Sequence, residues 1–251
     1  MENTKITHKK TLDAFHLKLI AIIAMLLNHI GSGFQIGLSH PWIYLFTETI
    51  GKLTFPIMAY LLVEGFYHTR NLKKYILRLA LFWILSIVPF HIYFFNNWNF
   101  TFLDLFNNVL FTLLVGLIMI VLCEKTENSL LRFCIVVFSM FLTVNSDWSL
   151  VGVLIIFWYY NIKDEKKRIM MPSIYIALPF LLITVIAKVA DPSFSNLFFI
   201  EGVGMLGMFL TIPLLLKYSG NRGYSPKWVK YGYYLFYPLH LTVLYIIRYF
   251  I

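Results

Sequence analysis

The sequence predicts an all-α protein, a polytopic membrane helix bundle of about nine spans with a cytoplasmic N-terminus and its C-terminus outside. Composition is the first reason. The 251 residues are 59% apolar and only 13% charged, and the mean hydropathy is +0.74, whereas soluble domains are about 25% charged. Long apolar stretches also recur along the chain, and a helix satisfies its own backbone hydrogen bonds in lipid.

Nine apolar stretches are candidate spans, and no soluble domain or internal repeat interrupts them. We therefore expect one membrane-embedded domain over residues 1–251 and a multi-pass location in the cytoplasmic membrane. The first stretch has full membrane length and follows a polar segment, so we expect a retained span. The spans cover roughly residues 17–36, 51–67, 76–95, 107–123, 131–145, 149–161, 172–188, 197–216 and 232–250.

The distribution of charge gives the expected orientation. With the N-terminus inside, alternating spans place most of the basic residues, Lys5 and Lys9 among them, in inner segments, as the positive-inside rule requires. The net charge of +9 therefore does not call for nucleic acid as a partner. Several acids instead fall at the outer ends of spans or in outer loops, namely Glu48, Asp104, Asp147, Asp191 and Glu201.

Two polar residues in the first span suggest chemistry. Lys18 and His29 are eleven residues apart, about three turns, so they share one helical face with Ile22 and Met25 and lie about 16 Å apart along the axis. His29 could be a general base, a nucleophile that carries an acyl group, or a structural histidine bonded to a neighbouring helix. Asn28 lies about 100° around the helix and could support the same pocket.

A second histidine lies in the last span. His240 follows Lys230 by ten residues, about 15 Å, so its depth resembles that of His29 above Lys18. The two histidines could meet if the bundle closes, or they could be unrelated core residues. Pro238 is expected to kink this helix and free a backbone carbonyl. We expect no metal, because the sequence lacks a ligand spacing such as H-x-x-x-H.

The densest group of basic residues lies in "EGFYHTRNLKKYILRLALF", residues 64–82, at the inner ends of two spans. Arg70, Lys74 and Arg78 recur at four-residue spacing, which predicts that they share one helical face. The stretch could be an inner loop that also holds anionic lipid headgroups. It could instead bind a phosphorylated cofactor through charge-assisted hydrogen bonds.

An asparagine pair, Asn107 and Asn108, opens the fourth span from the outside. The amide of Asn108 could donate a hydrogen bond to a developing oxyanion, which makes this residue a catalytic candidate. It could equally cap the helix, and composition alone favours the cap.

Several motifs together resemble the TraX family of integral-membrane acyltransferases over nearly the full chain, and more distantly the larger group of transmembrane acyltransferases. They are "LKLIAIIAMLLNHIG" (17–31), "GKLTFPIMAYLLVEGFYHTRNLKKYILRLALF" (51–82), "NVLFTLLVGL" (108–117) and "KYGYYLFYPLHLTVLY" (230–245). Two positions depart from the family pattern. Asn28 replaces the usual acid before the histidine, and Lys52 stands where an arginine is common.

The resemblance implies an acyl-CoA-dependent acyltransferase, with acetyl-CoA from the cytoplasm as the expected donor. Its catalytic candidates are His29, His240 and Asn108. The donor's phosphates would contact basic residues of the inner face: Lys18, His68, Arg70, Lys73, Lys74, Arg78 and Arg222. Further polar support would come from Asp13, Asn28 and Glu64.

The acceptor is expected to be an amine or hydroxyl reached from the outer side, either a pilin-like peptide N-terminus or a cell-envelope glycan. The family's namesake is linked to acetylation of a pilin N-terminus. Glu48 and Asp147 would attract an ammonium group, and His29 would remove its proton. The other expected partner is membrane lipid. The alternative function is a proton-coupled secondary transporter that uses buried His and Glu residues as a relay.

Overall fold

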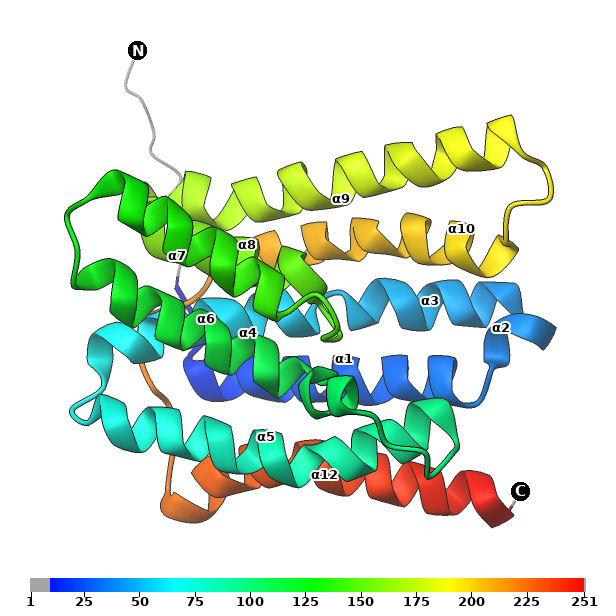
Figure 1. Ribbon diagram of the computed structural model, residues 1–251, viewed down its shortest axis with the longest axis horizontal. Helices are drawn as coiled ribbons and strands as arrows, with labels where there is room; N and C mark the ends of the chain where they lie inside the picture. The colour runs from blue at the N-terminus through cyan, green and yellow to red at the C-terminus, as the bar shows by residue number, and fades with distance from the viewer. Residues whose placement is uncertain (1–9, 251) are drawn as a thin grey trace.

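The structure, a computed structural model, describes residues 10–250 and is helical throughout (Figure 1). Lys5 and Lys9, which we expect on the inner side, lie outside the described residues. Within the described range the sole β-type pairing is an isolated bridge between Leu12 and Tyr218. The elements are α1 (Ala14–Gly33), α2 (Ile36–Ser39), α3 (Pro41–Gly51), α4 (Thr54–His68), α5 (Leu72–Phe95), η1 (Phe102–Phe106), α6 (Val109–Glu124), α7 (Ser129–Leu142), α8 (Ser149–Asn161), α9 (Glu165–Ala190), α10 (Asn196–Gly204), η2 (Met205–Leu210), α11 (Thr211–Leu216) and α12 (Lys227–Phe250).

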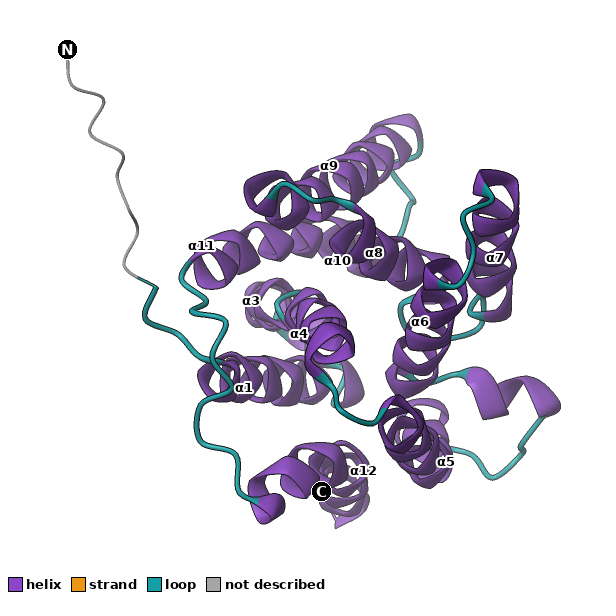
Figure 2. Ribbon diagram, turned by 90° about the vertical axis from the view of Figure 1, so that its left-hand side faces the viewer, coloured by secondary structure: helices purple, strands orange, loops and turns teal. Residues whose placement is uncertain are grey.

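The helices run back and forth along the long axis of the molecule (Figure 1). An end view shows α4 near the centre, whereas α7 and α9 lie at the edge (Figure 2). Helix α4 packs against α1, α6 and α8, and α12 packs against both α5 and α1. The first and last helices of the chain are therefore neighbours.

Apolar side chains cover much of the outer surface of the bundle. Helix α7 exposes Phe133, Phe138 and Phe141, and α9 exposes Ile183 and Val189. Such a surface suits lipid, because lipid does not penalise exposed apolar side chains as water does. Four helical segments are long and apolar enough to cross a membrane, Ala14–Gly33, Leu72–Phe95, Glu165–Ala190 and Asn196–Leu216, and α6, α7 and α8 are shorter apolar helices.

The predicted all-helical membrane bundle is thus confirmed, and each predicted span coincides with a helical segment. The number of spans and the orientation of the termini stay predictions. One difference concerns residues 37–50, where we predicted no span. Pro41, at the start of α3, is favourable at the first position of a helix. This helix then packs along α1 inside the bundle.

Small residues allow these helices to approach closely, as is common in membrane bundles. A Cβ atom on Gly31 would lie 2.1 Å from the Thr47 Oγ1 atom, and one on Gly51 would lie 2.5 Å from the Asn28 Cβ atom.

The predicted span 197–216 consists of three consecutive helical segments, α10, η2 and α11. In η2, a Cβ atom on Gly207 would lie 1.8 Å from the Thr49 carbonyl oxygen.

We predict that Gly207→Ala destabilises the protein, because the added methyl group meets backbone of α3 that cannot rotate aside. Overpacking of this kind costs about 1–3 kcal/mol. The matched control is Gly232→Ala in α12, where an added Cβ atom meets nothing within 4 Å. The thermal unfolding midpoint of detergent-purified protein should fall for the first variant and not for the second; equal midpoints would contradict the packing described.

Candidate functional site

The start of α1 is held against the segment that precedes α12. The backbone N–H of Thr11 donates to the Lys217 carbonyl at 2.9 Å, and that of Ala14 donates to the Asn221 carbonyl at 2.9 Å. Asp13 accepts from the backbone N–H of His16 at 3.0 Å and so caps α1. Asp13, predicted as polar support for the site, therefore has a structural role.

A glycine completes this junction. Gly223 has a φ of +67°, and a Cβ atom there would lie 2.3 Å from the Asp13 carboxylate. Only glycine combines that left-handed conformation with so close an approach. The neighbouring Arg222 is thereby brought to the same cavity as Lys18 of α1.

The turn between α4 and α5 arranges the densest basic group. Asn71 accepts from the backbone N–H of Lys74 at 2.9 Å, so it caps α5, which begins at Leu72. Arg70 consequently precedes the helix, and the prediction that it shares a helical face with Lys74 and Arg78 is wrong. All three nevertheless line one cavity.

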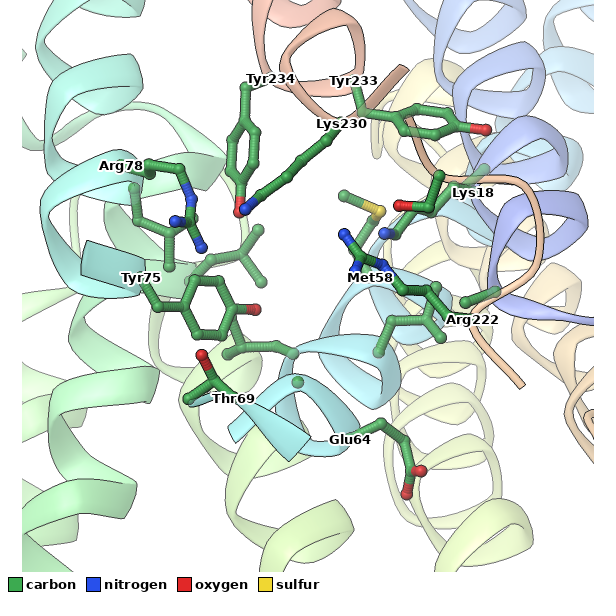
Figure 3. Close-up of a pocket in the computed structure, with 18 of the residues that line it drawn as sticks. Lys18, Met58, Glu64, Thr69, Tyr75, Arg78, Arg222, Lys230, Tyr233 and Tyr234 are labelled. Carbon is green, nitrogen blue, oxygen red and sulfur yellow. The ribbon is translucent and has the colours of Figure 1, made fainter. Parts of the chain in front are cut away.

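That cavity, which we call the inner cavity, has a volume of about 800 Å³ and is strongly basic (Figure 3). Figure 3 shows Lys18 and Arg222 on one side of an open space and Arg78 on the other, with the Lys230 side chain reaching toward Arg78. Lys73 does not line it, because it lies on an exposed face of α5 next to that of Lys74. Its ionisable lining also includes His68 and one carboxylate, Glu64. Six lining residues are Lys or Arg: Lys18, Arg70, Lys74, Arg78, Arg222 and Lys230.

Carboxylates of the described residues do not balance the positive charge of the inner cavity. Within residues 10–250, none of its six Lys and Arg side chains forms an ion pair with a carboxylate. Arg78 has a buried Nε atom with no hydrogen-bond partner and lies over the Tyr75 ring at 5.6 Å. The carboxylate of Glu64 lies 3.5 Å from Arg168 instead. Such a cavity suits an anionic ligand with several phosphates.

The two membrane histidines meet. The Nδ1 atom of His29 lies 2.7 Å from the Nε2 atom of His240, and both side chains are buried. The Nδ1 atom of His240 lies 2.7 Å from the Phe236 carbonyl oxygen. A carbonyl only accepts, so His240 carries its proton on Nδ1 and accepts from His29 on Nε2. His29 then carries its proton on Nδ1, which leaves its Nε2 lone pair available.

His29 also lines a second, smaller cavity of about 250 Å³, which we call the outer cavity. Four residues line both cavities, so their side chains form the junction between the two: Met25, Thr54, Val109 and Tyr237. The α1 face predicted from Lys18, Ile22, Met25 and His29 runs from the inner cavity to the outer one. His29 therefore lies where ligands in the two cavities would meet.

The two acids predicted to bind an acceptor lie in different surroundings. Asp147 lines the outer cavity, together with Asn28 and Lys52. Glu48 lines neither cavity: it is buried in α3, and it accepts from Asn28 Nδ2 at 2.6 Å and from Lys52 Nζ at 2.9 Å. We predicted Glu48 at the outer end of a span or in an outer loop and as an acceptor-binding group; the structure instead buries its carboxylate, which its two donors allow to lie inside the bundle.

Asn108 is the N-cap of α6. Its side-chain oxygen accepts from the Leu110 backbone N–H at 3.1 Å, and its amide donates to the Trp83 carbonyl at 3.5 Å. Asn108 is fully buried and lines neither cavity. We therefore do not retain its side chain as a catalytic group.

Tyr237 is a residue of the site that the sequence did not predict. It lies one turn before His240 and lines both cavities at their junction.

Comparison with known proteins identifies the family of this chain. The model of the TraX protein family matches residues 14–248, a range that contains both cavities and the histidine pair. The "Probable fimbrial assembly protein FimC, serogroup H1" of Dichelobacter nodosus is 30% identical over 244 residues, which cover 92% of this chain and 94% of the relative. No solved structure matches the chain. Since the family model spans almost the whole chain, the protein belongs to the TraX family.

Proposed function

We propose that this protein is an acyltransferase of the cytoplasmic membrane. It moves an acetyl group from acetyl-CoA, bound in the inner cavity, to an amine or hydroxyl that enters the outer cavity. One observation carries the proposal: His29, whose Nε2 atom is available, lines the smaller cavity next to its junction with the basic one. A donor and an acceptor that approach from opposite sides would meet there.

The inner cavity fits the donor. Acetyl-CoA carries its phosphates at one end and its thioester at the other, and the unbalanced basic side chains lie at the Lys18 end of α1. Arg78, Lys74 and Arg222 would hold phosphates through charge-assisted hydrogen bonds, with the buried Nε atom of Arg78 as one donor. The thioester arm would then follow the α1 face past Ile22 and Met25 toward His29.

The proposed reaction is direct transfer with His29 as the general base. The acceptor nitrogen or oxygen attacks the thioester carbonyl carbon and forms a new bond, while His29 Nε2 takes the acceptor's proton. The carbon–sulfur bond then breaks, and His29 returns the proton to the sulfur so that CoA leaves as a thiol. His240 holds the tautomer of His29 and stabilises the imidazolium that forms. Transfer through an acyl-histidine stays open as a second route.

The acceptor is proposed to be a peptide N-terminus, with a cell-envelope glycan as the other candidate. The Dichelobacter nodosus relative is described as a fimbrial assembly protein, which favours a pilin-like peptide. Asp147 in the outer cavity would attract an ammonium group, and it is the acid we retain for this role. Glu48 would act indirectly, because it holds Asn28 and Lys52 beside the same cavity.

The alternative, a proton-coupled transporter, would use His29 and buried Glu residues as a relay. Glu48 is already held by Asn28 and Lys52 and lines neither cavity, which disfavours Glu48 as a member of that relay. Asp147 shares the outer cavity with His29, so ligand binding is the measurement that separates the two functions. A bound donor would stabilise an acyltransferase against heat. Uptake by proteoliposomes without any stabilisation by CoA would instead favour the transporter.

We predict that His29→Ala lowers acetyl transfer by roughly 10²–10⁴-fold, because the general base is lost. Purified protein would be incubated with acetyl-CoA and a synthetic peptide with a free N-terminus, and both released thiol and acetylated peptide would be measured. Stabilisation by CoA should persist and would show that the variant is folded. His40→Ala is the control, since His40 is exposed and lines neither cavity. Full activity of a folded His29→Ala protein would exclude the mechanism.

We predict that Arg78→Ala weakens CoA binding by about 10- to 100-fold, because a hydrogen bond between charged groups is lost. The loss should shrink at high salt, where charges are screened. Lys73→Ala removes the same charge five residues away, outside the inner cavity, and should leave affinity almost unchanged. Equal CoA affinities for the two variants, measured by titration of the thermal shift, would place the donor elsewhere.

A further inference from the structure

Tyr237 carries a buried hydroxyl whose proton has no acceptor among residues 10–250. Its side chain is 3% exposed, and its hydroxyl is buried without a hydrogen-bond partner within the described residues. The ring centroid lies 6.3 Å from that of His29 and 5.7 Å from that of His240. A buried hydroxyl without an acceptor destabilises a protein, so its presence at the junction of two cavities indicates a bound partner.

A second donor lies beside it. Val109 is the first residue of α6 and also lines both cavities. Its backbone N–H faces the Tyr237 hydroxyl oxygen and has no other acceptor among residues 10–250, and the hydroxyl proton of Tyr237 has no acceptor there either. The N-terminus of a helix such as α6 has unpaired N–H groups and a partial positive charge. Both donors therefore belong to the same junction.

We infer that the Tyr237 hydroxyl and the Val109 backbone N–H together bind the carbonyl oxygen of the acyl group and stabilise the negative charge that develops there. The inference rests on the proposed acyl transfer and adds a catalytic residue to it. When the acceptor attacks, the carbonyl electron pair moves onto the oxygen, and it returns when the carbon–sulfur bond breaks. Tyr237 keeps its proton throughout and acts only as a hydrogen-bond donor.

Asn108 contributes to this arrangement indirectly. Its side-chain amide is a predicted oxyanion donor, but the side chain caps α6 and bonds to the Trp83 carbonyl. The cap fixes the start of α6, and so it positions the Val109 N–H. The extended backbone of Asn108, with φ −101° and ψ 159°, is also compatible with a proline at the next residue.

The central test is Tyr237→Phe, which removes the hydroxyl and keeps the ring. Loss of one oxyanion donor should lower kcat for acetyl transfer to the peptide by roughly 10²–10³-fold, with little change in KM for acetyl-CoA. The matched control is Tyr159→Phe. The Tyr159 hydroxyl is also buried and unpaired, but it lines neither cavity, so this variant should keep full activity.

The backbone donor can be removed as well. Val109→Pro deletes the N–H at the first position of α6, where proline is well tolerated. It should lower kcat by about tenfold or more while the thermal unfolding midpoint and the CoA-induced shift stay unchanged. A folded Val109→Pro protein with full activity would remove this group from the proposal.

Binding provides a readout besides turnover. The probe is a ketone analogue of acetyl-CoA in which a methylene group replaces the sulfur, compared with CoA itself, which has no acyl carbonyl. Tyr237→Phe should weaken binding of the analogue by several-fold and leave binding of CoA unchanged. Equal effects on both ligands, or a kcat within twofold of the unchanged protein, would overturn the assignment of Tyr237. If the unchanged protein neither binds CoA nor releases thiol from acetyl-CoA, the proposed function itself fails, and the inference fails with it.

Discussion

The structure depends on the hydrogen bond between His29 and His240, which joins the first and last helices of the chain. Each imidazole needs a partner, because a polar group surrounded by apolar side chains and lipid has no water to bond. Further hydrogen bonds hold the same two helices, α1 and α12, together with α5. Tyr93 donates to the His29 carbonyl at 2.5 Å, and Arg248 donates to the carbonyls of Gly33 and Tyr93 at 3.0 and 3.1 Å. Helices α1, α5 and α12 are thus held around the histidine pair.

The polar groups of the bundle divide into two sets by whether the protein satisfies them. Glu48 is paired with Asn28 and Lys52, and Tyr44 donates to Glu201 at 2.9 Å. These contacts hold α1, α3 and α10 together. A second set faces the cavities. It comprises the Lys and Arg side chains of the inner cavity, which form no ion pair among residues 10–250, and the Tyr237 hydroxyl, whose proton has no acceptor there. In a membrane protein this second set is the better guide to ligands, because leaving such groups unpaired is costly.

Local periodicity accounts for what the sequence could predict. The helical class follows from composition, and the face shared by Lys18, Met25 and His29 follows from the helical repeat alone. The placement of most predicted basic residues around one cavity follows from their recurrence at the ends of alternate spans. The exception, Lys73, differs from Lys74 by a single residue, and only the rotation of α5 decides which of the two faces the cavity.

Packing decides the rest. Glu48 and Lys52 looked like the boundary of a span, because nothing local reveals that Asn28 will meet them from another helix. The positions of Arg70 and Asn108 depend on the residue at which α5 or α6 begins. A single capping side chain sets that residue in each helix. The approach of His29 to His240 spans 211 residues of sequence. Tyr237 gave no indication of its role, since one tyrosine among 16 stands out only when its hydroxyl is seen to lack a partner.

The position of α12 has a consequence for the order of synthesis. This helix is synthesised after the other described helices, yet it and the segment before it supply Arg222, Lys230, Tyr237 and His240, which reach from the inner cavity to the histidine pair. A nascent chain that ends before α12 has an exposed His29 without its partner and an inner cavity open along one side. The proposed acetyl transfer therefore requires α12 to be in place beside α1, so a chain that lacks α12 would not consume acetyl-CoA.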